Sequence, residues 1–318
     1  MILDYKPPIQ KMRFTVGNNS FFIMRDDLIP FSFGGNKVRI AQQYFSDLDE
    51  KGCDCMVTFG SDTSNLCRVI ANMSAAKGIP CYIIMPISDI QERPLSSNYK
   101  LINALGAIVI RCLDNAISDT VEKTLAMCAM DGFKPYYTHG DKFGKTNKKT
   151  PIQAYVNAYE EIISFEQKSN INFDYIFHAS GTGMTQAGLI CGSILHNDNR
   201  NIIGVSIARC YEAGKKAIAE YVNCYYSKRL VSTKSTRITF IDDYVLGGYS
   251  KYNDDVIKII QRVLMSDGIA LDPIYTGKAF CGMEQYCIER NIKNKNILFI
   301  HTGGAPLFFD YVDSLANE

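Results

Sequence analysis

Lys37 follows two glycines and an asparagine, in the segment GGNK at 34–37, and it opens an apolar stretch with helical character. A lysine amine becomes a nucleophile when its pKa is lowered, and the positive end of a helix beside Arg39 would lower it. A solvated surface lysine is the alternative interpretation. The segment makes Lys37 a candidate nucleophile.

A second segment, GSDTSN at 60–65, follows a predicted strand and precedes a predicted helix. The segment is rich in hydroxyl, carboxylate and amide side chains. One of these side chains suffices to cap a helix, and capping is the simpler interpretation. The surplus of hydroxyls and amides also suits a bound carboxylate.

A third segment, GTGMTQAG at 181–188, again lies between a predicted strand and a predicted helix. The dinucleotide fingerprint requires a third glycine at 186, where this chain has Gln, so that interpretation is weak. Free backbone N–H groups and threonine hydroxyls at a helix start suit an anion, best a phosphate.

A lysine nucleophile, a carboxylate site and a phosphate site together describe pyridoxal phosphate and an amino acid. On these segments, with DPIYTGK at 272–278 and HTGGAP at 301–306, the sequence resembles the pyridoxal-phosphate enzymes of fold type II, the tryptophan-synthase-β-like group. It is most similar to the branch of D-cysteine desulfhydrase and 1-aminocyclopropane-1-carboxylate (ACC) deaminase. The motifs follow the family's order over almost the whole chain.

The resemblance implies that pyridoxal 5'-phosphate is bound as a Schiff base on Lys37, which also moves the Cα proton. Asn65 would bond the ring 3-oxygen, and Tyr275 would stack on the ring. The residues that would cradle the phosphate are Gly181, Thr182, Gly183 and Thr185. Ser64 would lie beside the substrate carboxylate and Tyr249 would face the substrate, although either tyrosine could serve packing in a chain with 19 Tyr.

Two threonines at the ring nitrogen bear on the reaction. By resemblance, the ACC deaminases have Glu and Leu at these two positions. This chain has Thr276 and Thr302 there, and threonine at both positions is usual in the desulfhydrase branch. Without a carboxylate the electron sink is shallower, which suits loss of a good β leaving group. We therefore expect a lyase that performs β-elimination on a small β-substituted amino acid such as D-cysteine.

Other functions stay open: β-replacement on a related amino acid, ACC deamination, racemisation or other Cα chemistry, and a non-catalytic binding protein. The chain departs from the family pattern at Ile40, Leu66, Met184 and Ser250. Leu66 and Ser250 would lie at the substrate end by analogy, so they bear on the substrate more than on the cofactor.

Alternating apolar runs and amphipathic stretches predict an α/β protein with two domains, each a parallel sheet wrapped by helices. Residues 1–40 and 149–318 would form a large cofactor-binding domain and residues 41–148 a small inserted one, with a turn-rich boundary at 140–151. Strands are predicted at 54–59, 80–85, 107–110, 175–179, 202–207 and 297–300. Helices are predicted at 63–77, 95–105, 117–130, 184–193, 213–225 and 254–265.

The composition excludes several classes of protein. The 318 residues carry 34 Lys+Arg against 33 Asp+Glu, so the net charge of +1 argues against binding of nucleic acid or anionic membrane. No apolar run reaches the roughly 18 residues of a membrane helix, and the N-terminus lacks a signal peptide's core, so we expect a cytoplasmic protein. Neither the 11 Cys nor the 4 His have zinc spacing, and we expect no metal. The resemblance suggests a homodimer.

Overall fold

The structure, a computed structural model, describes residues 5–87, 96–144 and 146–315. The chain divides into two compact units: a small unit of residues 37–151, and a large unit that ends at residue 36 and resumes at 152. The sequence predicts boundaries after 40 and 148; the chain instead changes unit inside the first turns of two helices, which begin at Asn36 and Thr150. Leu95 in a predicted helix and Lys145 in the predicted boundary segment lie outside the described residues.

The small unit contains a four-stranded parallel sheet in the order β5-β4-β3-β6. Its strands are β3 (Cys55–Phe59), β4 (Cys81–Pro86), β5 (Ile108–Cys112) and β6 (Pro135–Tyr137). Its helices are α1 (Asn36–Glu50), α2 (Asn65–Lys77), α3 (Ser97–Ala104) and α4 (Ile117–Met130).

The core of the small unit packs α4 on the sheet. Val57 of β3 and Ile84 of β4 are fully buried against Val121 and Cys128 of α4. The 117–130 helix has the bounds that its apolar periodicity predicts. Helix α2 ends at Gly78, whose φ of 72° lies in the left-handed region that favours glycine at a helix end.

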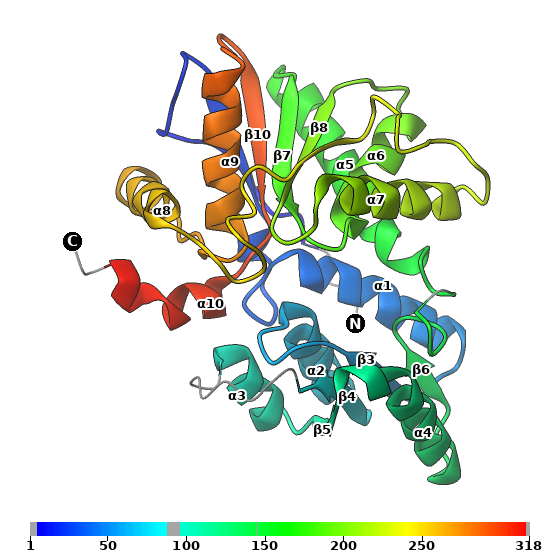
Figure 1. The fold of residues 1–318 in the computed structure, drawn as a ribbon. Coiled ribbons are helices and arrows are strands. Elements are labelled where there is room, and N and C mark those ends of the chain that lie inside the picture. The colour runs from blue at the N-terminus through cyan, green and yellow to red at the C-terminus, as the bar shows by residue number, and fades with distance from the viewer. Residues whose placement is uncertain (1–4, 88–95, 145, 316–318) are drawn as a thin grey trace. The chain divides into compact units, whose positions relative to one another are not determined.

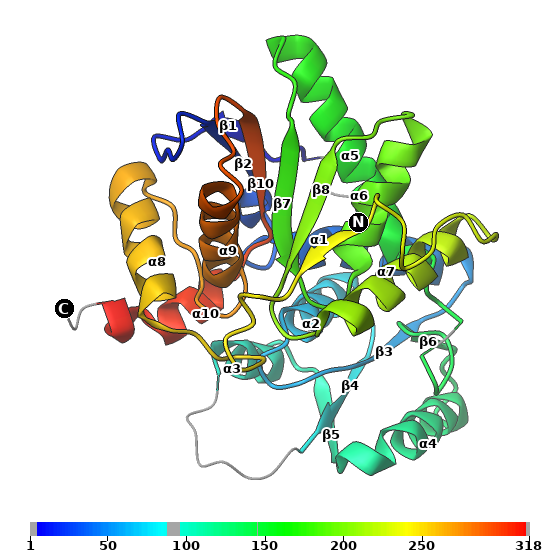
Figure 2. The same ribbon diagram turned by 45° about the horizontal axis from the view of Figure 1, so that its top comes forward.

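The large unit contains a six-stranded sheet in the order β1-β2-β10-β7-β8-β9, whose central strands can be followed in Figure 2. Only β1 is antiparallel to its neighbour. The strands are β1 (Ile9–Lys11), β2 (Ser20–Arg25), β7 (Tyr175–Ser180), β8 (Asn201–Ser206), β9 (Thr239–Ile241) and β10 (Asn296–His301). The helices are α5 (Thr150–Ser169), α6 (Met184–Leu195), α7 (Tyr211–Tyr225), α8 (Asp254–Asp267), α9 (Thr276–Glu289) and α10 (Ala305–Asp310).

Helices α8 and α9 cover one face of this sheet, and Figure 1 shows α9 lying along β10 and β7. Alternate strand residues such as Phe177 and Phe299 point to that face, where they pack against Ile260 and Phe280. The strand–helix alternation and the parallel sheets predicted from the sequence are confirmed.

Helices α5 and α6 pack closely on each other because α6 carries glycine at the contacts. A Cβ at Gly188 would lie 2.5 Å from the Cβ of Tyr155, and one at Gly192 would lie 2.4 Å from the Cβ of Tyr159. Glycine is therefore required at both positions for the helices to approach this far.

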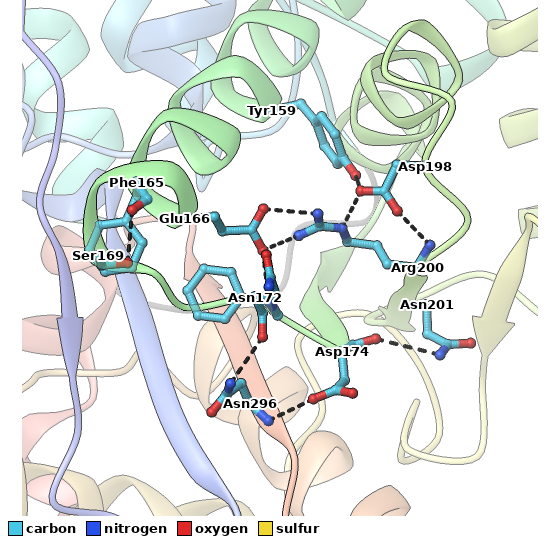
Figure 3. A network of polar contacts seen from close by, with 11 residues as sticks. Tyr159, Phe165, Glu166, Ser169, Asn172, Asp174, Asp198, Arg200, Asn201 and Asn296 are labelled. Carbon is cyan, nitrogen blue, oxygen red and sulfur yellow. Dashed lines mark hydrogen bonds and ion pairs between the residues drawn. The ribbon is translucent and has the colours of Figure 1, made fainter.

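A buried ion network fixes the end of α5 near the start of β8, as Figure 3 shows. The guanidinium of Arg200 donates to both carboxylate oxygens of Glu166, at 2.6 and 2.9 Å, and to Asp198 Oδ2 at 2.5 Å. Tyr159 also donates its hydroxyl proton to Asp198. These groups lie at the amino ends of the strands, so the network stabilises the packing of α5 at that edge of the sheet and not the opposite edge.

The opposite edge gathers the segments singled out in the sequence. Because β2, β7 and β10 run parallel, the segments that follow them leave the sheet at one edge. They include the glycine pairs at 34–35 and 303–304 and the loop that starts at Gly181. No helix among the described residues is long and apolar enough to cross a bilayer.

Candidate active site

Two glycine pairs meet backbone to backbone in the large unit. A Cβ at Gly35 would lie 2.8 Å from the carbonyl oxygen of Thr302, and one at Gly303 would lie 2.6 Å from the Cα of Gly35. Both glycines have φ near 98°, a region that side chains rarely tolerate. The pairs in GGNK and HTGG thus allow two main-chain segments to touch, and Asn36 N–H donates to Thr302 O at 3.0 Å.

His301 holds the second of these segments. Its Nδ1 accepts a hydrogen bond from Gly303 N–H at 3.2 Å, so its Nε2 carries the proton and donates to Ala270 O at 3.0 Å. The imidazole therefore fixes the turn from Thr302 to Gly304.

The loop 181–185 is joined to the same place by Asn36, whose Nδ2 donates to Thr185 Oγ1 at 3.3 Å. Gly183, with a φ of 92°, starts α6 and provides no side-chain cap. Within the described part of the chain, the N–H groups of residues 182–186 have no acceptor. Free amides at the start of a twelve-residue helix can hold an anion, and the sequence predicts a phosphate at this loop.

Lys37 is the residue after Asn36, so its Cα lies within about 4 Å of the Asn36 Cα across one peptide bond. The side chain is half-buried in the first turn of α1. Burial lowers the pKa of its amine to about 8. At pH 7 roughly a tenth of the amine is therefore unprotonated and nucleophilic, far more than for a lysine with its ordinary pKa of 10.5.

Asp272 organises the start of α9, the helix that begins at Thr276. Its Oδ1 accepts from the N–H groups of Ile274 and Tyr275, and its Oδ2 accepts from the N–H and the hydroxyl of Thr276. Burial raises the pKa of Asp272, while the hydrogen bonds from Thr276 and the backbone act in the opposite direction. The carboxylate is saturated by donors of its own loop.

The hydroxyl of Thr276 is consequently in use. It donates to Asp272 Oδ2 at 2.8 Å and accepts from Asp272 N–H at 2.9 Å, and the residue is fully buried. The hydroxyl of Thr302, half-buried, makes no hydrogen bond to any residue that the structure describes. Of the two threonines, Thr302 is the one whose hydroxyl proton is available to a ligand.

Tyr249 and Tyr275 form a pair in the large unit, with their hydroxyls hydrogen-bonded to each other. Tyr249 comes from an exposed turn, whereas Tyr275 immediately precedes α9. Burial and the neighbouring Tyr249 raise the pKa of Tyr275 well above that of a free phenol. Tyr275 therefore remains a protonated donor at neutral pH.

In the small unit, Ser64 caps α2. Its Oγ accepts from Cys67 N–H at 3.2 Å, which is the capping role that the sequence allows. Beside it, Ser61 and Thr63 share a hydrogen bond at 3.1 Å. A capping serine keeps its hydroxyl proton free to donate, so Ser64 can still bind a carboxylate.

Asn65 is oriented by two buried side chains. Its Oδ1 accepts from Asn98 Nδ2 at 3.0 Å and from Arg68 NH2 at 3.4 Å. Asn98 also accepts from Arg68 Nε at 2.8 Å and donates to Thr63 O at 2.9 Å. Because the oxygen of Asn65 is occupied, its NH2 group is the part left to donate to an acceptor such as a phenolate oxygen.

The departures from the family pattern have different environments. Ile40 is fully buried in α1, where a charged side chain would be costly, and Leu66 and Met184 are also buried. Ser250 has a φ of 63°, in the region that favours the glycine usual at this position in the family.

Sequence reasoning missed five supporting residues. Asn36, Asp272 and Lys278 lie inside the quoted motifs, so their position beside assigned residues was a usable signal. Arg68 and Asn98 carry no local signal, because only the tertiary fold shows that they are buried against Asn65. No group of three or more His, Cys, Asp and Glu in the described ranges is arranged to hold a metal.

Comparison with known proteins gives a consistent result. A family model described as pyridoxal-phosphate dependent enzyme matches residues 6–303. A solved structure of a homologue of ACC deaminase is 28% identical, with a TM-score of 0.84, and the match covers 99% of this chain and 94% of that one.

More distant structures share the fold. A hydrogen sulfide-producing enzyme from Fusobacterium nucleatum is 18% identical, with a TM-score of 0.64 over 95% of this chain and 96% of that one. An O-ureido-L-serine synthase is 15% identical, with a TM-score of 0.64 over 96% of this chain and 93% of that one. These neighbours establish the tryptophan-synthase-β-like architecture of fold type II.

Proposed function

Because the chain belongs to the family of pyridoxal-phosphate dependent enzymes, we propose that it is a lyase that removes the β-substituent of a small amino acid such as D-cysteine. Two structural features suit the cofactor. The free amides at the start of α6 suit its phosphate, and the amine of Lys37, with a pKa of about 8, suits its aldehyde. When bound, the cofactor takes up the electron pair that loss of the Cα proton leaves behind.

The residues of this chain have separate tasks in the proposal. Lys37 holds the cofactor and carries the Cα proton. Thr182 and Thr185 add hydroxyls to the backbone amides around the phosphate, and Asn65 donates to the ring 3-oxygen. Ser64 binds the substrate carboxylate. Assignment of these tasks rests on the resemblance and is supported by the free donors at Asn65 and in the loop.

Tyr249 and Tyr275 serve the substrate and the ring. Tyr275 keeps its proton, since burial raises its pKa, and its hydrogen bond to Tyr249 orients both hydroxyls. A protonated tyrosine pair can donate to the departing β-substituent, and Tyr275 can pack its ring on the cofactor.

The observation that carries the reaction class is the hydrogen bond between Thr276 and Asp272. In the ACC deaminases the residue at 276 is Glu by resemblance; here it is a hydroxyl whose proton goes to Asp272 at 2.8 Å. The four hydrogen bonds that the nearby Asp272 carboxylate accepts occupy its lone pairs, so it offers no acceptor to a ring nitrogen. An environment of hydroxyls favours elimination of a good leaving group over ring opening.

The overall change is balanced without an added oxidant or reductant. The Cα proton passes to Lys37, the Cβ–S bond breaks with its electron pair on sulfur, and sulfide leaves after taking up a proton. Water then converts the released enamine into pyruvate and ammonia.

A substrate screen tests the proposal. The holoenzyme is given D-cysteine, L-cysteine, β-chloro-D-alanine and ACC, and pyruvate, 2-oxobutanoate, ammonia and sulfide are measured together. Equal amounts of pyruvate, ammonia and sulfide from a cysteine are expected, and Lys37→Ala should yield none. 2-Oxobutanoate from ACC without pyruvate from any β-substituted substrate would refute the proposal.

ACC deamination is the second candidate, because the 28% identical structure is that of an ACC deaminase homologue. Thr276→Glu separates the two candidates: it should lower pyruvate formation relative to any 2-oxobutanoate formation. Repeating the screen with added thiols tests β-replacement, which would consume the thiol and form a new thioether amino acid instead of ammonia.

A further inference from the structure

Lys278 has a fully buried side chain on α9 that the tasks above do not use. Its ammonium donates to three main-chain carbonyl oxygens: Val245 at 3.0 Å, Gly248 at 3.1 Å and Ile207 at 3.5 Å. Three acceptors match the three N–H bonds of an ammonium. Two of these carbonyls belong to the turn that presents Tyr249.

That turn has an unfavourable backbone. Leu246, Gly247, Gly248 and Ser250 have φ values of 56°, 84°, 134° and 63°. Left-handed conformations are disfavoured for leucine and serine, and such residues persist only when surrounding contacts fix them. The turn therefore requires a contact from outside itself.

The ammonium binds the two carbonyls that close the turn. Val245 O also accepts from Gly248 N–H at 3.2 Å, and Gly248 O also accepts from Lys251 N–H at 3.3 Å. A charged donor on each carbonyl strengthens the hold on both successive bends. Lys278 thus contacts the turn at the two points that define its shape.

Lys278 and Tyr275 lie one helical turn apart at the start of α9, and both contact the segment 245–250. Lys278 binds its carbonyls, and Tyr275 binds the hydroxyl of Tyr249. We infer that Lys278 is a positioning residue that fixes the turn 245–250 and thereby places the Tyr249 hydroxyl on Tyr275. The consequence for turnover rests on the proposed function, in which Tyr249 faces the substrate.

A cavity beside Lys278 makes this role accessible to experiment. Its volume is about 230 Å³, and its lining includes Lys278, Leu246, Val256 and Cys281. Shortening Lys278 to alanine would extend this space toward the turn carbonyls. A small alkylammonium ion could then enter and donate to the same oxygens.

The test uses the variants Lys278→Ala and Lys278→Met, with Lys258→Ala on the exposed side of α8 as the matched control. Hydrogen–deuterium exchange of the holoenzyme is followed in peptides that cover the turn 245–250 and, as an internal reference, β10. Loss of the ammonium should make the turn exchange about tenfold faster and leave β10 unchanged. Lys258→Ala should exchange like the unaltered protein.

Chemical rescue is the second measurement. Propylammonium at millimolar concentration should slow exchange of the turn in Lys278→Ala but not in Lys278→Met, whose side chain fills the space. Turn exchange that stays at the unaltered rate in a folded variant, or that rises together with exchange of β10, would overturn the inference.

Two further outcomes of the exchange experiment also decide between the inference and the proposed function. If neither variant folds, exchange of the unaltered protein decides: the inference requires the turn to be protected well beyond an unstructured peptide. Protection lost in the variants of a protein that converts no β-substituted amino acid would reject the proposed function and leave the role of Lys278 in place.

Discussion

The hydroxyl of Thr276 donates a hydrogen bond to the carboxylate of Asp272 at 2.8 Å. The backbone N–H of Thr276 also donates to that carboxylate, and the backbone N–H of Asp272 donates to the Thr276 hydroxyl. This closed pair forms the start of α9. It links the DPIYTGK motif to the HTGG motif as well, because a Cβ at Gly304 would lie 2.3 Å from Asp272 Oδ2. Thr276 is therefore structural before it is catalytic.

Thr276→Val should destabilise the protein by about 1–3 kcal/mol, because the buried Asp272 carboxylate loses a donor and the backbone N–H of Asp272 loses its acceptor. Thr276→Ser keeps the hydroxyl and should be within about 1 kcal/mol of the unaltered protein. Urea unfolding followed by circular dichroism measures both. Equal stability of the two variants would show that the hydroxyl contributes little.

Labelling of Lys37 should depend on pH in a specific way. Only the unprotonated amine attacks an aldehyde, and burial lowers the pKa of Lys37 from 10.5 to about 8. The rate of imine formation by the apoprotein with pyridoxal should therefore rise with pH and level off above about 8, not above 10. Borohydride reduction and peptide mapping should place the label on Lys37, and a label on another lysine would contradict the assignment.

The phosphate loop can be tested through cofactor affinity. Thr182→Ala and Thr185→Ala should each weaken binding of pyridoxal phosphate by about 1–3 kcal/mol, the range of a lost hydrogen bond to a charged group. Thr185→Ala should have the larger effect, because it also removes the acceptor of Asn36 Nδ2 at 3.3 Å. Equilibrium titration of the apoprotein measures both, and unchanged affinity in both variants would place the phosphate elsewhere.

Where strands and helices follow one period, the sequence predicted them well. The strand at 175–179 and the helices at 117–130 and 254–265 have one clear apolar face and recur within about two residues of their predicted bounds. Helix α9 was not predicted, because Gly277 and Gly282 interrupt its pattern. Both glycines are needed: a Cβ there would lie 2.6 Å from Ile260 and 2.7 Å from Val205.

The site divides in the same way. Motifs at strand ends predict the anion loop, since glycines and hydroxyls in sequence are enough to indicate free amides, and the GGNK segment predicts Lys37 as the nucleophile. The contacts that support the site residues come from distant parts of the chain: Asn98 hydrogen-bonds Asn65, and Asp272 lies close against Gly304 of the HTGG turn. Such partners are set by tertiary packing, which a single sequence does not display.

The orientation of Asn65 is open to a direct test. Asn98→Ala removes the donor to Asn65 Oδ1 and the acceptor of Arg68 Nε, so the Asn65 amide loses its fixed orientation. Affinity for pyridoxal phosphate should fall by about 1–2 kcal/mol, and the apoprotein should lose about 1–3 kcal/mol of stability.

The matched control is Asn103→Ala, an exposed asparagine of the same helix, which should change neither quantity. Asn98→Asp keeps an acceptor for Arg68 but loses the donor, so its stability should recover more than its cofactor affinity does. Unaltered affinity in both Asn98 variants would show that Asn65 needs no such support.

His178 gives the protein an acid sensitivity that is separate from the active-site groups. It lies fully buried in β7, its Nδ1 donates to Ala179 O at 3.0 Å, and its Nε2 has no hydrogen-bond partner among the described residues. Burial lowers the pKa of His178 to about 4. The folded protein thus keeps this ring neutral where the unfolded chain, with a histidine pKa of about 6.5, already protonates it.

Stability should therefore be lost as the pH falls from about 6.5 toward 4, because protons bind to the unfolded chain first. Between pH 7 and pH 5 the contribution of His178 amounts to about 2 kcal/mol of unfolding free energy. His178→Leu removes the titrating group and the unpartnered nitrogen. Between pH 7 and pH 5 the variant should therefore lose about 2 kcal/mol less unfolding free energy than the unaltered protein. Urea unfolding of both proteins at pH 7 and pH 5 measures the difference, with His196→Leu, an exposed histidine in the same unit, as the control. If the two proteins lose the same stability between these pH values, the neutral state of His178 has no energetic consequence.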